Sequence, residues 1–176
     1  MDSNLRVLIS RTQIAQKVQE AAIQVQRDYT GKDLVIVMVM KGAICIVADL
    51  IRELDLPFDI EFVQCSSYGA QGMVRGPLEV IGLDRLNIHN RDVLIIDDIF
   101  DSGNTLSTLT RALAAKHPRS IKSLVLLSKN VPHITDLRPD YVLFHIDDHF
   151  VIGYGLDYKD RFRGLDGVYE LTNPQF

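Results

Sequence analysis

The stretch VLIIDDIFDSGNTL, Val93 to Leu106, decides the fold. It begins with an apolar, β-branched run without polar alternation, which is typical of a strand buried on both faces of a parallel sheet. Leu34 to Met40 has the same character and is followed by apolar residues at helical spacing up to Pro57. Such alternation predicts an α/β fold with helices on both faces of a parallel sheet, in which ligands bind beyond the carboxyl ends of the strands.

The polar half of this stretch predicts a binding site. Asp97 and Asp98 come at the carboxyl end of the strand, a short loop adds Asp101, and Ser102-Gly103-Asn104-Thr105 opens a helix. Helix N-termini carry unpaired N–H groups, and small residues let a phosphate approach the backbone closely. The stretch therefore offers a phosphate cradle beside carboxylates that accept hydrogen bonds from vicinal hydroxyls, which suits a ribose 5-phosphate.

A purely structural interpretation is that Asp101 or Ser102 only caps the helix. Three carboxylates crowded beyond one strand repel one another unless a metal or hydroxyl donors satisfy them, which argues against that interpretation. The phosphate-binding pattern GxxxxGK[ST] is absent, and no GxGxxG opens the first helix. These absences lower the support for P-loop hydrolases and Rossmann dehydrogenases.

Further elements follow from spacing and from turn residues. Ser10 and Gln13 form a capping box at the start of an amphipathic helix that Gly31 ends. A helix over Leu106 to Leu113 is halted at Pro118. Additional strands are predicted over Phe58 to Cys65, Leu78 to Ile81, Val93 to Ile96, Leu124 to Leu127 and Tyr141 to Ile146, with a strand-like stretch from Phe150 to Gly155. Ser66 to Pro77 is predicted to be a long functional loop, and the tail from Asp157 to Phe176 shows no clear periodicity.

Composition excludes several classes. The chain has 176 residues, and its net charge of −4 gives no reason to expect a nucleic-acid partner. Cys45 and Cys65 lack metal-ligand spacing and are interpreted as small buried hydrophobes. No stretch is apolar enough over a sufficient length to span a membrane, and the N-terminus does not resemble a signal peptide, so we expect a cytoplasmic protein.

The stretch from Val93 to Leu106 closely resembles the phosphoribosyl-pyrophosphate-binding signature of type I phosphoribosyltransferases. The resemblance is strongest to hypoxanthine-guanine phosphoribosyltransferases, and it extends from Lys41-Gly42 through SSYG at Ser66 to FVIGYGLDYKDRFR at Phe150 to Arg163. It implies the type I phosphoribosyltransferase fold, a central, mostly parallel twisted sheet flanked by helices. It also implies one domain over 1–176, with a core at about 33–146 and a small hood from about 1–30 and 147–176.

The resemblance also implies a reaction in purine salvage. The 5-phosphoribosyl group passes from phosphoribosyl pyrophosphate to N9 of hypoxanthine or guanine, giving IMP or GMP and pyrophosphate, with Mg²⁺ as cofactor. By similarity, Asp97 and Asp98 hold the ribose hydroxyls directly or through the metal, and the segment from Asp101 through Ser102, Gly103 and Asn104 to Thr105 wraps the 5-phosphate. Asp101 is then the catalytic residue, which accepts the N7 proton of the purine.

The purine side is assigned in the same way. Lys129 matches a lysine that contacts the purine 6-oxo group, and a donor-only ammonium disfavours adenine. Phe150 is expected to stack on the base and the Val151 backbone to read its edge, although Phe150 also suits plain core. Asp157 corresponds to a second acid associated with magnesium, so the implied metal residues are Asp97, Asp98 and Asp157.

The remaining implied residues surround the leaving group. Lys41, Gly42 and Arg163 are expected at pyrophosphate, and the peptide before Lys41 is often cis in relatives. Ser67 and Tyr68 belong to the loop that closes over the reaction centre and excludes water. The implied assembly is a homodimer or homotetramer.

Some features leave alternatives open. Many relatives have Glu where this chain has Asp97, so contact there can run through water, and Asn130 to Arg138 lacks the basic cluster that many relatives carry. A metal pair of His145 and His149 conflicts with the strand-like neighbours. A xanthine-preferring enzyme, a non-catalytic nucleotide-sensing regulator and a signalling receiver are the rival functions.

Overall fold

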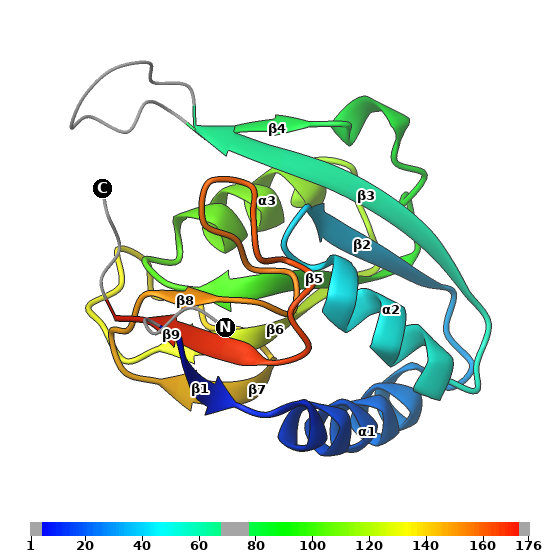
Figure 1. Ribbon diagram of the computed structural model, residues 1–176. Helices are drawn as coiled ribbons and strands as arrows, with labels where there is room; N and C mark the ends of the chain where they lie inside the picture. Colours follow the sequence, from blue (N-terminus) through cyan, green and yellow to red (C-terminus); the bar gives the residue numbers. More distant parts are fainter. Residues whose placement is uncertain (1–4, 68–77, 173–176) are drawn as a thin grey trace.

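The computed structural model describes residues 5–67 and 78–172, and its centre is a six-stranded sheet (Figure 1). The strand order is β4-β3-β2-β5-β6-β7, and every neighbouring pair is parallel except β3 and β4. This arrangement confirms the predicted α/β class. The strands are β2 (Leu34–Met40), β3 (Phe58–Ser67), β4 (Leu78–Ile81), β5 (Asp92–Phe100), β6 (Ser120–Lys129) and β7 (Tyr141–Ile146).

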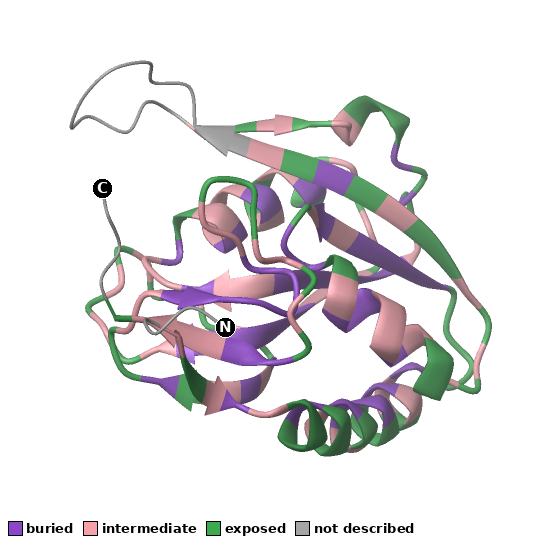
Figure 2. Cartoon of the chain, in the orientation of Figure 1, coloured by how far each residue is buried: buried purple, intermediate pink, exposed green. Residues whose placement is uncertain are grey.

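Helices cover both faces of this sheet. The helix α1 (Arg11–Tyr29) packs on α2 (Ile44–Glu53), and both bury Leu34 and Ile36 of β2 in one apolar cluster. The helix α3 (Asn104–Ala114) lies on the opposite face and shares a second cluster with Val35 and Val37. A short 3-10 helix, η1 (Leu83–Arg85), follows β4. Most residues of β2 and β5 are buried (Figure 2), as expected for apolar strands that are covered on both faces of a parallel sheet.

The predicted capping box at the start of α1 is present. The Gln13 N–H donates to Ser10 Oγ at 3.4 Å, and the Ser10 N–H donates to Gln13 Oε1 at 2.9 Å. Gly31 follows the helix with a φ of +74°, a conformation that glycine adopts without strain. None of the helices in residues 5–67 and 78–172 is long and apolar enough to cross a membrane.

A second, smaller sheet joins remote parts of the chain. It is antiparallel in the order β1-β9-β8 and comprises β1 (Leu5–Ile9), β8 (Val151–Ile152) and β9 (Val168–Leu171). We call it the hood sheet. Neither β1 nor β9 is predicted by the sequence, and β9 lies in the tail after Asp157 that shows no clear periodicity. The strand expected to reach Gly155 stops at Ile152, because Gly153 and Gly155 turn the chain with φ of +93° and +102°.

Strand β5 is longer than predicted. It continues to Phe100, which pairs with Ser128 of the neighbouring β6. Asp97 and Asp98 therefore lie within the last part of the strand rather than after it. Strand β6 likewise extends past the predicted range of Leu124 to Leu127, and Lys129 is its final residue.

Candidate active site

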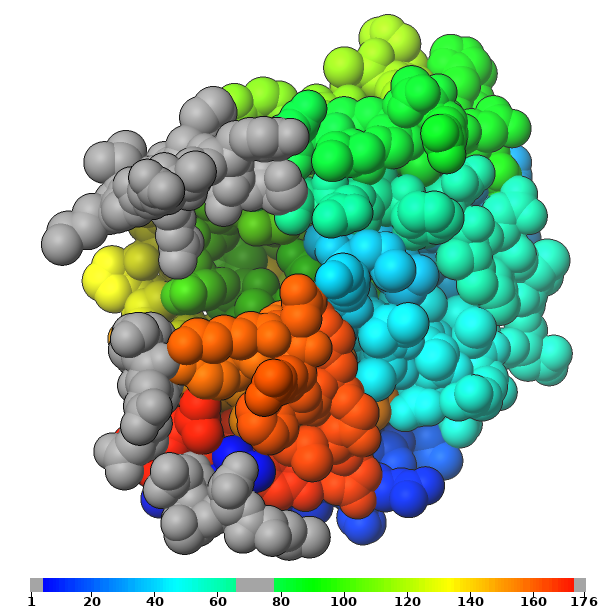
Figure 3. Space-filling view, turned by 45° about the horizontal axis from the view of Figure 1, so that its top comes forward, coloured from blue at the N-terminus to red at the C-terminus, as the bar shows by residue number. Residues whose placement is uncertain are grey.

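The carboxyl ends of β2 and β5 border a cavity of about 310 Å³. Figure 3 shows the molecular surface hollowed between the connection after β2 (cyan), the β5–α3 region (green) and the C-terminal segment (orange). Predicted site residues from three separate parts of the chain line this cavity together, namely Lys41, Gly42, Asp97, Asp98, Thr105, Asp157 and Arg163.

The turn after β2 lies directly against the acidic pair of β5. The Met40–Lys41 peptide bond is cis, which confirms the expectation from the resemblance. Gly42 is buried, and a methyl group at its Cα would overlap the Asp98 carboxyl group. A methyl group at Gly155 would in turn overlap the Gly42 carbonyl oxygen. Both glycines are thus required for close approach of backbone to the cavity.

Asp97 and Asp98 are like charges held side by side. Only 5% of Asp97 is exposed, and its carboxylate accepts a hydrogen bond from the Asp98 N–H at 2.9 Å. Burial raises the pKa of Asp97 well above its ordinary value, and the neighbouring charge of Asp98 raises it further. Burial also raises the pKa of Asp98, whereas its hydrogen bonds and the positive charge of Arg163 lower it. A bound cation or hydroxyl donors would relieve this pair.

The loop between β5 and α3 forms a smaller cavity of about 110 Å³, whose lining includes Asp101, Ser102, Gly103, Asn104 and Thr105. Gly103 caps α3 with a φ of +84° and supplies no side-chain bond to the helix end. The Asn104 N–H reaches the neighbouring Ser102 Oγ at 3.4 Å. The start of α3 lines this cavity, as an anion site at a helix N-terminus requires.

Two residues of the segment Asn130 to Arg138, His133 and Ile134, hold this loop in place. The Ile134 N–H donates to the Ser102 carbonyl at 2.9 Å, and His133 Nδ1 lies 2.6 Å from the Asp101 carbonyl oxygen. The His133 ring also packs on Phe100, with centroids 4.7 Å apart. No local pattern marks these residues, because they act through packing on a loop that is distant in sequence.

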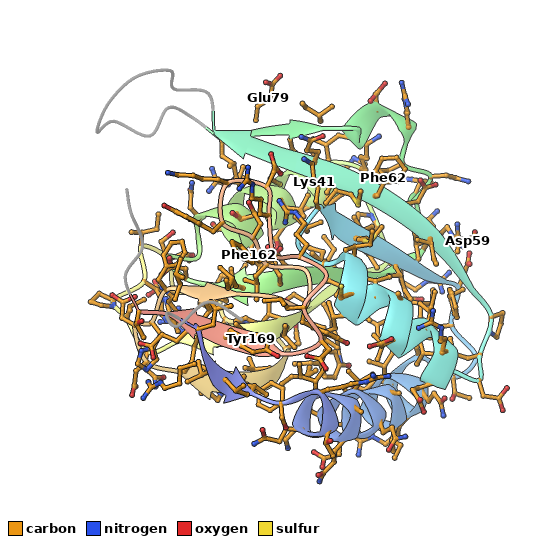
Figure 4. All side chains as sticks on the ribbon, viewed as in Figure 1. Lys41, Asp59, Phe62, Glu79, Phe162 and Tyr169 are labelled. Atoms are coloured by element: carbon orange, nitrogen blue, oxygen red, sulfur yellow. The ribbon has the colours of Figure 1, made fainter. Side chains whose placement is uncertain are left out.

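A network of ion pairs links Lys41 and Arg163, the two charged residues expected at pyrophosphate. Arg163 donates to the Gly155 carbonyl at 2.8 Å and pairs with Asp157 at 2.7 Å and Asp160 at 3.2 Å. Asp160 also pairs with Lys41 at 3.0 Å, and these bonds lower the pKa of Asp160. In Figure 4, Lys41 and the loop that carries Phe162 lie on the same side of the sheet. The sequence analysis did not identify Asp160.

The acidic residues suit a magnesium ion that is shared with a substrate. Asp97, Asp98 and Asp157 line the same cavity and offer the oxygen ligands that Mg²⁺ prefers. Across residues 5–67 and 78–172, no three carboxylate, imidazole or thiolate side chains converge into a metal cage. Mg²⁺ typically needs only one or two carboxylates when substrate phosphates complete its shell, so the residues present fit it.

His149, one of the two histidines considered as a metal pair in the sequence, pairs with Glu170 at 2.8 Å.

The residues expected at the purine lie beside the end of β5. Lys129 follows Ser128, the pairing partner of Phe100, and its side chain is 13% exposed. Val151 is buried in β8, and the Phe150 ring stands edge-on to Tyr158 with centroids 5.6 Å apart. Of the predicted loop residues, Ser67 ends β3 and Tyr68 lies outside the described residues.

The two cysteines are half-buried rather than fully buried as expected. Cys65 lines the larger cavity, and burial raises the pKa of its thiol to about 12. Cys45 lies on α2, and burial raises its pKa as well. Neither thiol is primed for nucleophilic attack at neutral pH.

Comparisons with known proteins agree with this geometry. Residues 9–159 match the family model of the phosphoribosyl transferase domain. The chain is 42% identical over 169 residues to the hypoxanthine-guanine phosphoribosyltransferase of Mycobacterium tuberculosis, covering 92% of this chain and 83% of that protein.

Two solved structures extend the comparison. A hypoxanthine phosphoribosyltransferase from Staphylococcus aureus is 36% identical with a TM-score of 0.87, covering 94% of this chain and 90% of that one. The enzyme from Trypanosoma cruzi, in complex with the product IMP, is 33% identical with a TM-score of 0.88, covering 97% of this chain and 96% of that one. The chain therefore belongs to the phosphoribosyl transferase domain family, and its fold is that of the hypoxanthine phosphoribosyltransferases.

Proposed function

We propose that the chain is a purine-salvage enzyme that forms IMP or GMP and pyrophosphate from phosphoribosyl pyrophosphate and hypoxanthine or guanine. The observation that carries this proposal is the meeting of three chemical units at one edge of the sheet. These units are the N-terminus of α3 with the glycine that precedes it, the buried pair Asp97–Asp98, and the two cations Lys41 and Arg163. They match, in order, the phosphate, the ribose and the pyrophosphate of one substrate.

The 5-phosphate binds in the loop from Asp101 to Thr105. Backbone N–H groups at the start of α3 and the hydroxyls of Ser102 and Thr105 donate to its oxygens. Asp97 and Asp98 accept hydrogen bonds from the two ribose hydroxyls, directly or through water and metal. Their raised pKa values mean that binding of donors or a cation here stabilises the charged pair.

Lys41, Gly42 and Arg163 contact the pyrophosphate. The two positive side chains and the backbone of the turn neutralise the charge that develops on the leaving group. Mg²⁺, held by oxygens of Asp97, Asp98 and Asp157 together with substrate, would add charge neutralisation at the polyphosphate when bound. The Asp157–Arg163 pair at 2.7 Å holds the arginine next to this position.

The chemical step exchanges one bond at the anomeric carbon. The bond from this carbon to the pyrophosphate oxygen breaks, and purine N9 supplies the electron pair for the new bond. Asp101 accepts the N7 proton, which makes N9 a better nucleophile, and its negative charge favours the oxocarbenium-like transition state. Exclusion of water protects that transition state from hydrolysis, a role proposed for the loop that begins at Ser67 and Tyr68.

Selectivity for 6-oxopurines comes from Lys129. Its ammonium only donates hydrogen bonds, so it pairs with a 6-oxo acceptor and meets the adenine amino group donor to donor. Phe150 stacks on the base, and the Val151 backbone reads the base edge. Adenine is therefore a poor substrate.

We further propose that the enzyme is a cytoplasmic homodimer or homotetramer. Ile60, Phe62 and Ile81 share one face of the β3–β4 arm, and they are 43%, 59% and 50% exposed. Figure 4 labels Phe62 on this arm. Exposed apolar side chains grouped on one face favour burial against another protein surface. Sedimentation of the wild-type chain and of Phe62→Glu tests this, because a monomeric wild type would contradict it.

The test of the reaction is nucleotide formation from phosphoribosyl pyrophosphate and Mg²⁺. Hypoxanthine, guanine, xanthine and adenine are offered separately, with Asp101→Asn as the control. We expect turnover of hypoxanthine and guanine, little with adenine, and loss of turnover in the variant. Preference for xanthine would instead identify a xanthine-preferring relative. Binding of phosphoribosyl pyrophosphate without turnover of any base would favour a nucleotide-sensing regulator.

A further inference from the structure

Lys129 has a carboxylate partner to which no role has yet been given. Its Nζ lies 2.8 Å from Asp148 Oδ1, and the lysine side chain is 13% exposed whereas that of Asp148 is 72% exposed. An ammonium group that is largely withdrawn from water needs a partner of opposite charge. Within residues 5–67 and 78–172, Asp148 is the only carboxylate that pairs with Lys129.

The backbone around Asp148 is fixed from two sides. On the β6 side, the Asn130 N–H donates to the Ile146 carbonyl at 2.8 Å, and the Asn130 side-chain amide donates to Asp147 at 3.1 Å. On the hood side, His149 pairs with Glu170 at 2.8 Å. An exposed side chain on so constrained a segment points in a defined direction, unlike most surface carboxylates.

The same segment continues into the residues expected at the base. The Leu171 N–H of β9 donates to the Phe150 carbonyl at 2.9 Å, and Val151 pairs with Glu170. Asp148 thus pairs with the lysine expected at the 6-oxo group and lies shortly before Phe150, the aromatic residue expected to stack on the ring. One rigid segment places both the base-stacking residue and the counter-ion of Lys129.

An ammonium group has three N–H donors. One of them bonds Asp148, which leaves two donors whose directions are then restricted around the C–N bond. A lysine side chain otherwise has several rotatable bonds, and ordering it when the base binds would cost conformational entropy. The hydrogen bond from Lys129 lowers the pKa of Asp148, so the carboxylate is charged at neutral pH.

We propose that Asp148 is a positioning residue that holds the Lys129 ammonium toward the 6-oxo group of the purine and so determines affinity for 6-oxopurines. This inference rests on the proposed function and deepens it. Asp148 itself does not touch the reacting atoms. It acts on base binding and leaves the phosphoribosyl pyrophosphate side unchanged, because that side is built from β2, β5 and the loop that carries Arg163.

Asp148→Asn tests the inference, since it removes the charge and keeps the shape. We expect the KM for hypoxanthine to rise about tenfold, which corresponds to about 1.4 kcal/mol of lost binding. The KM for phosphoribosyl pyrophosphate and kcat should stay within about twofold, as expected when only binding of one substrate is lost. Asp148→Glu keeps the charge and should recover most of the hypoxanthine affinity.

Asp147→Asn is the matched control. It removes one negative charge at the adjacent position and leaves an amide oxygen that still accepts from Asn130. This variant should match the wild type in both KM values and in kcat. A similar rise in the hypoxanthine KM for both variants would show a general charge effect and overturn the positioning role.

Three other outcomes also decide between these explanations. An unchanged hypoxanthine KM in Asp148→Asn refutes the inference while the proposed reaction stands. Equal increases in both KM values, with a lower melting temperature, would mean that the pair is merely structural. If the wild-type chain forms no nucleotide from any base, the proposed function fails first and this inference falls with it.

Discussion

The two edges of the central sheet treat their charges in opposite ways. At the amino edge, the buried Asp92 accepts hydrogen bonds from Ser120 at 2.7 Å and from Arg119 at 3.0 Å. Asp28 nearby accepts from Tyr141 at 2.6 Å and from Lys122 at 2.8 Å. At the carboxyl edge, Asp97 and Asp98 lie side by side, and their burial raises both pKa values.

This difference shows which buried carboxylates are stabilised by partners within the chain and which are placed to bind a ligand. Satisfied carboxylates at the amino edge contribute to the free energy of unfolding. The acidic pair and the start of α3 at the carboxyl edge gain further stabilisation when donors, cations or anions arrive from outside. Substitutions at the amino edge should therefore lower stability and leave activity unchanged, whereas substitutions at the carboxyl edge should lower activity without loss of stability.

The largest effect is expected at Asp101. Asp101→Asn should lower kcat by about 10²- to 10⁴-fold, the usual contribution of a positioned general base. Binding of phosphoribosyl pyrophosphate and the melting temperature should change little, since the amide keeps the shape of the loop. Steady-state kinetics with hypoxanthine, together with thermal melting, measures both, and a wild-type kcat would refute the assignment of the base.

The reverse pattern is expected for Asp92→Ala at the amino edge. The substitution leaves Ser120 and Arg119 without their acceptor and should cost about 1–3 kcal/mol of stability. For a chain of this size each kcal/mol lowers the melting temperature by about 2–4 °C. The kcat of the folded fraction should equal that of the wild type. A fall in kcat without a fall in stability would break the distinction between the edges.

Asp97→Asn should make the protein more stable at neutral pH while it lowers activity. The pKa of Asp97 is raised in the folded state, so the folded protein binds more protons than the unfolded one between the two values. The contribution of this group to stability therefore falls as pH rises through that window. Relief of about 1 kcal/mol would raise the melting temperature at pH 7 by about 2–4 °C.

Thermal melting of both proteins between pH 4 and pH 8 checks this prediction. The gain in stability of the variant should shrink toward acidic pH, where the wild-type carboxyl group becomes protonated. A variant that is less stable than the wild type at neutral pH would mean that Asp97 is already compensated within the chain.

The smallest effect is expected for Tyr141→Phe. The hydrogen bonds from Lys122 and Tyr141 lower the pKa of Asp28 from its ordinary value of 3.8. The stability that this carboxylate contributes is present above that value and is lost as pH falls toward the folded pKa. Removing one hydroxyl donor should cost about 1 kcal/mol at pH 7.

Urea unfolding at pH 7 and pH 3 measures the effect, with Tyr158→Phe as a comparison tyrosine far from this cluster. The cost of Tyr141→Phe should be the same at pH 3 as at pH 7, because the lowered pKa keeps the Asp28 carboxylate of the folded protein charged at both pH values. A cost that falls at pH 3 would mean that Asp28 is already protonated there, so that its hydrogen bonds do not lower its pKa.

Local sequence was enough for one side of the site. The strand, the turn and the helix around Asp97 to Thr105 are contiguous, so apolar runs and small residues predicted them without knowledge of the fold. The roles expected for Lys41 and Arg163 came from the resemblance, and the structure brings both residues to the same cavity.

The remainder was not visible because it depends on pairing between distant segments. Strands β1 and β9 are short, and each has its partner near the other end of the sequence. The contacts of His133 with Asp101, of Asp160 with Lys41 and of Asp148 with Lys129 likewise join separate segments. No periodicity within one segment encodes such contacts.

The hood sheet has a consequence for the order in which the protein acquires its site during synthesis. Strand β1 leaves the ribosome early, yet its partner β9 is made only after the whole central sheet. The loop that carries Arg163 connects β8 to β9. A nascent chain can therefore form the phosphate cradle of β5 and α3 well before the arginine clamp can close on it.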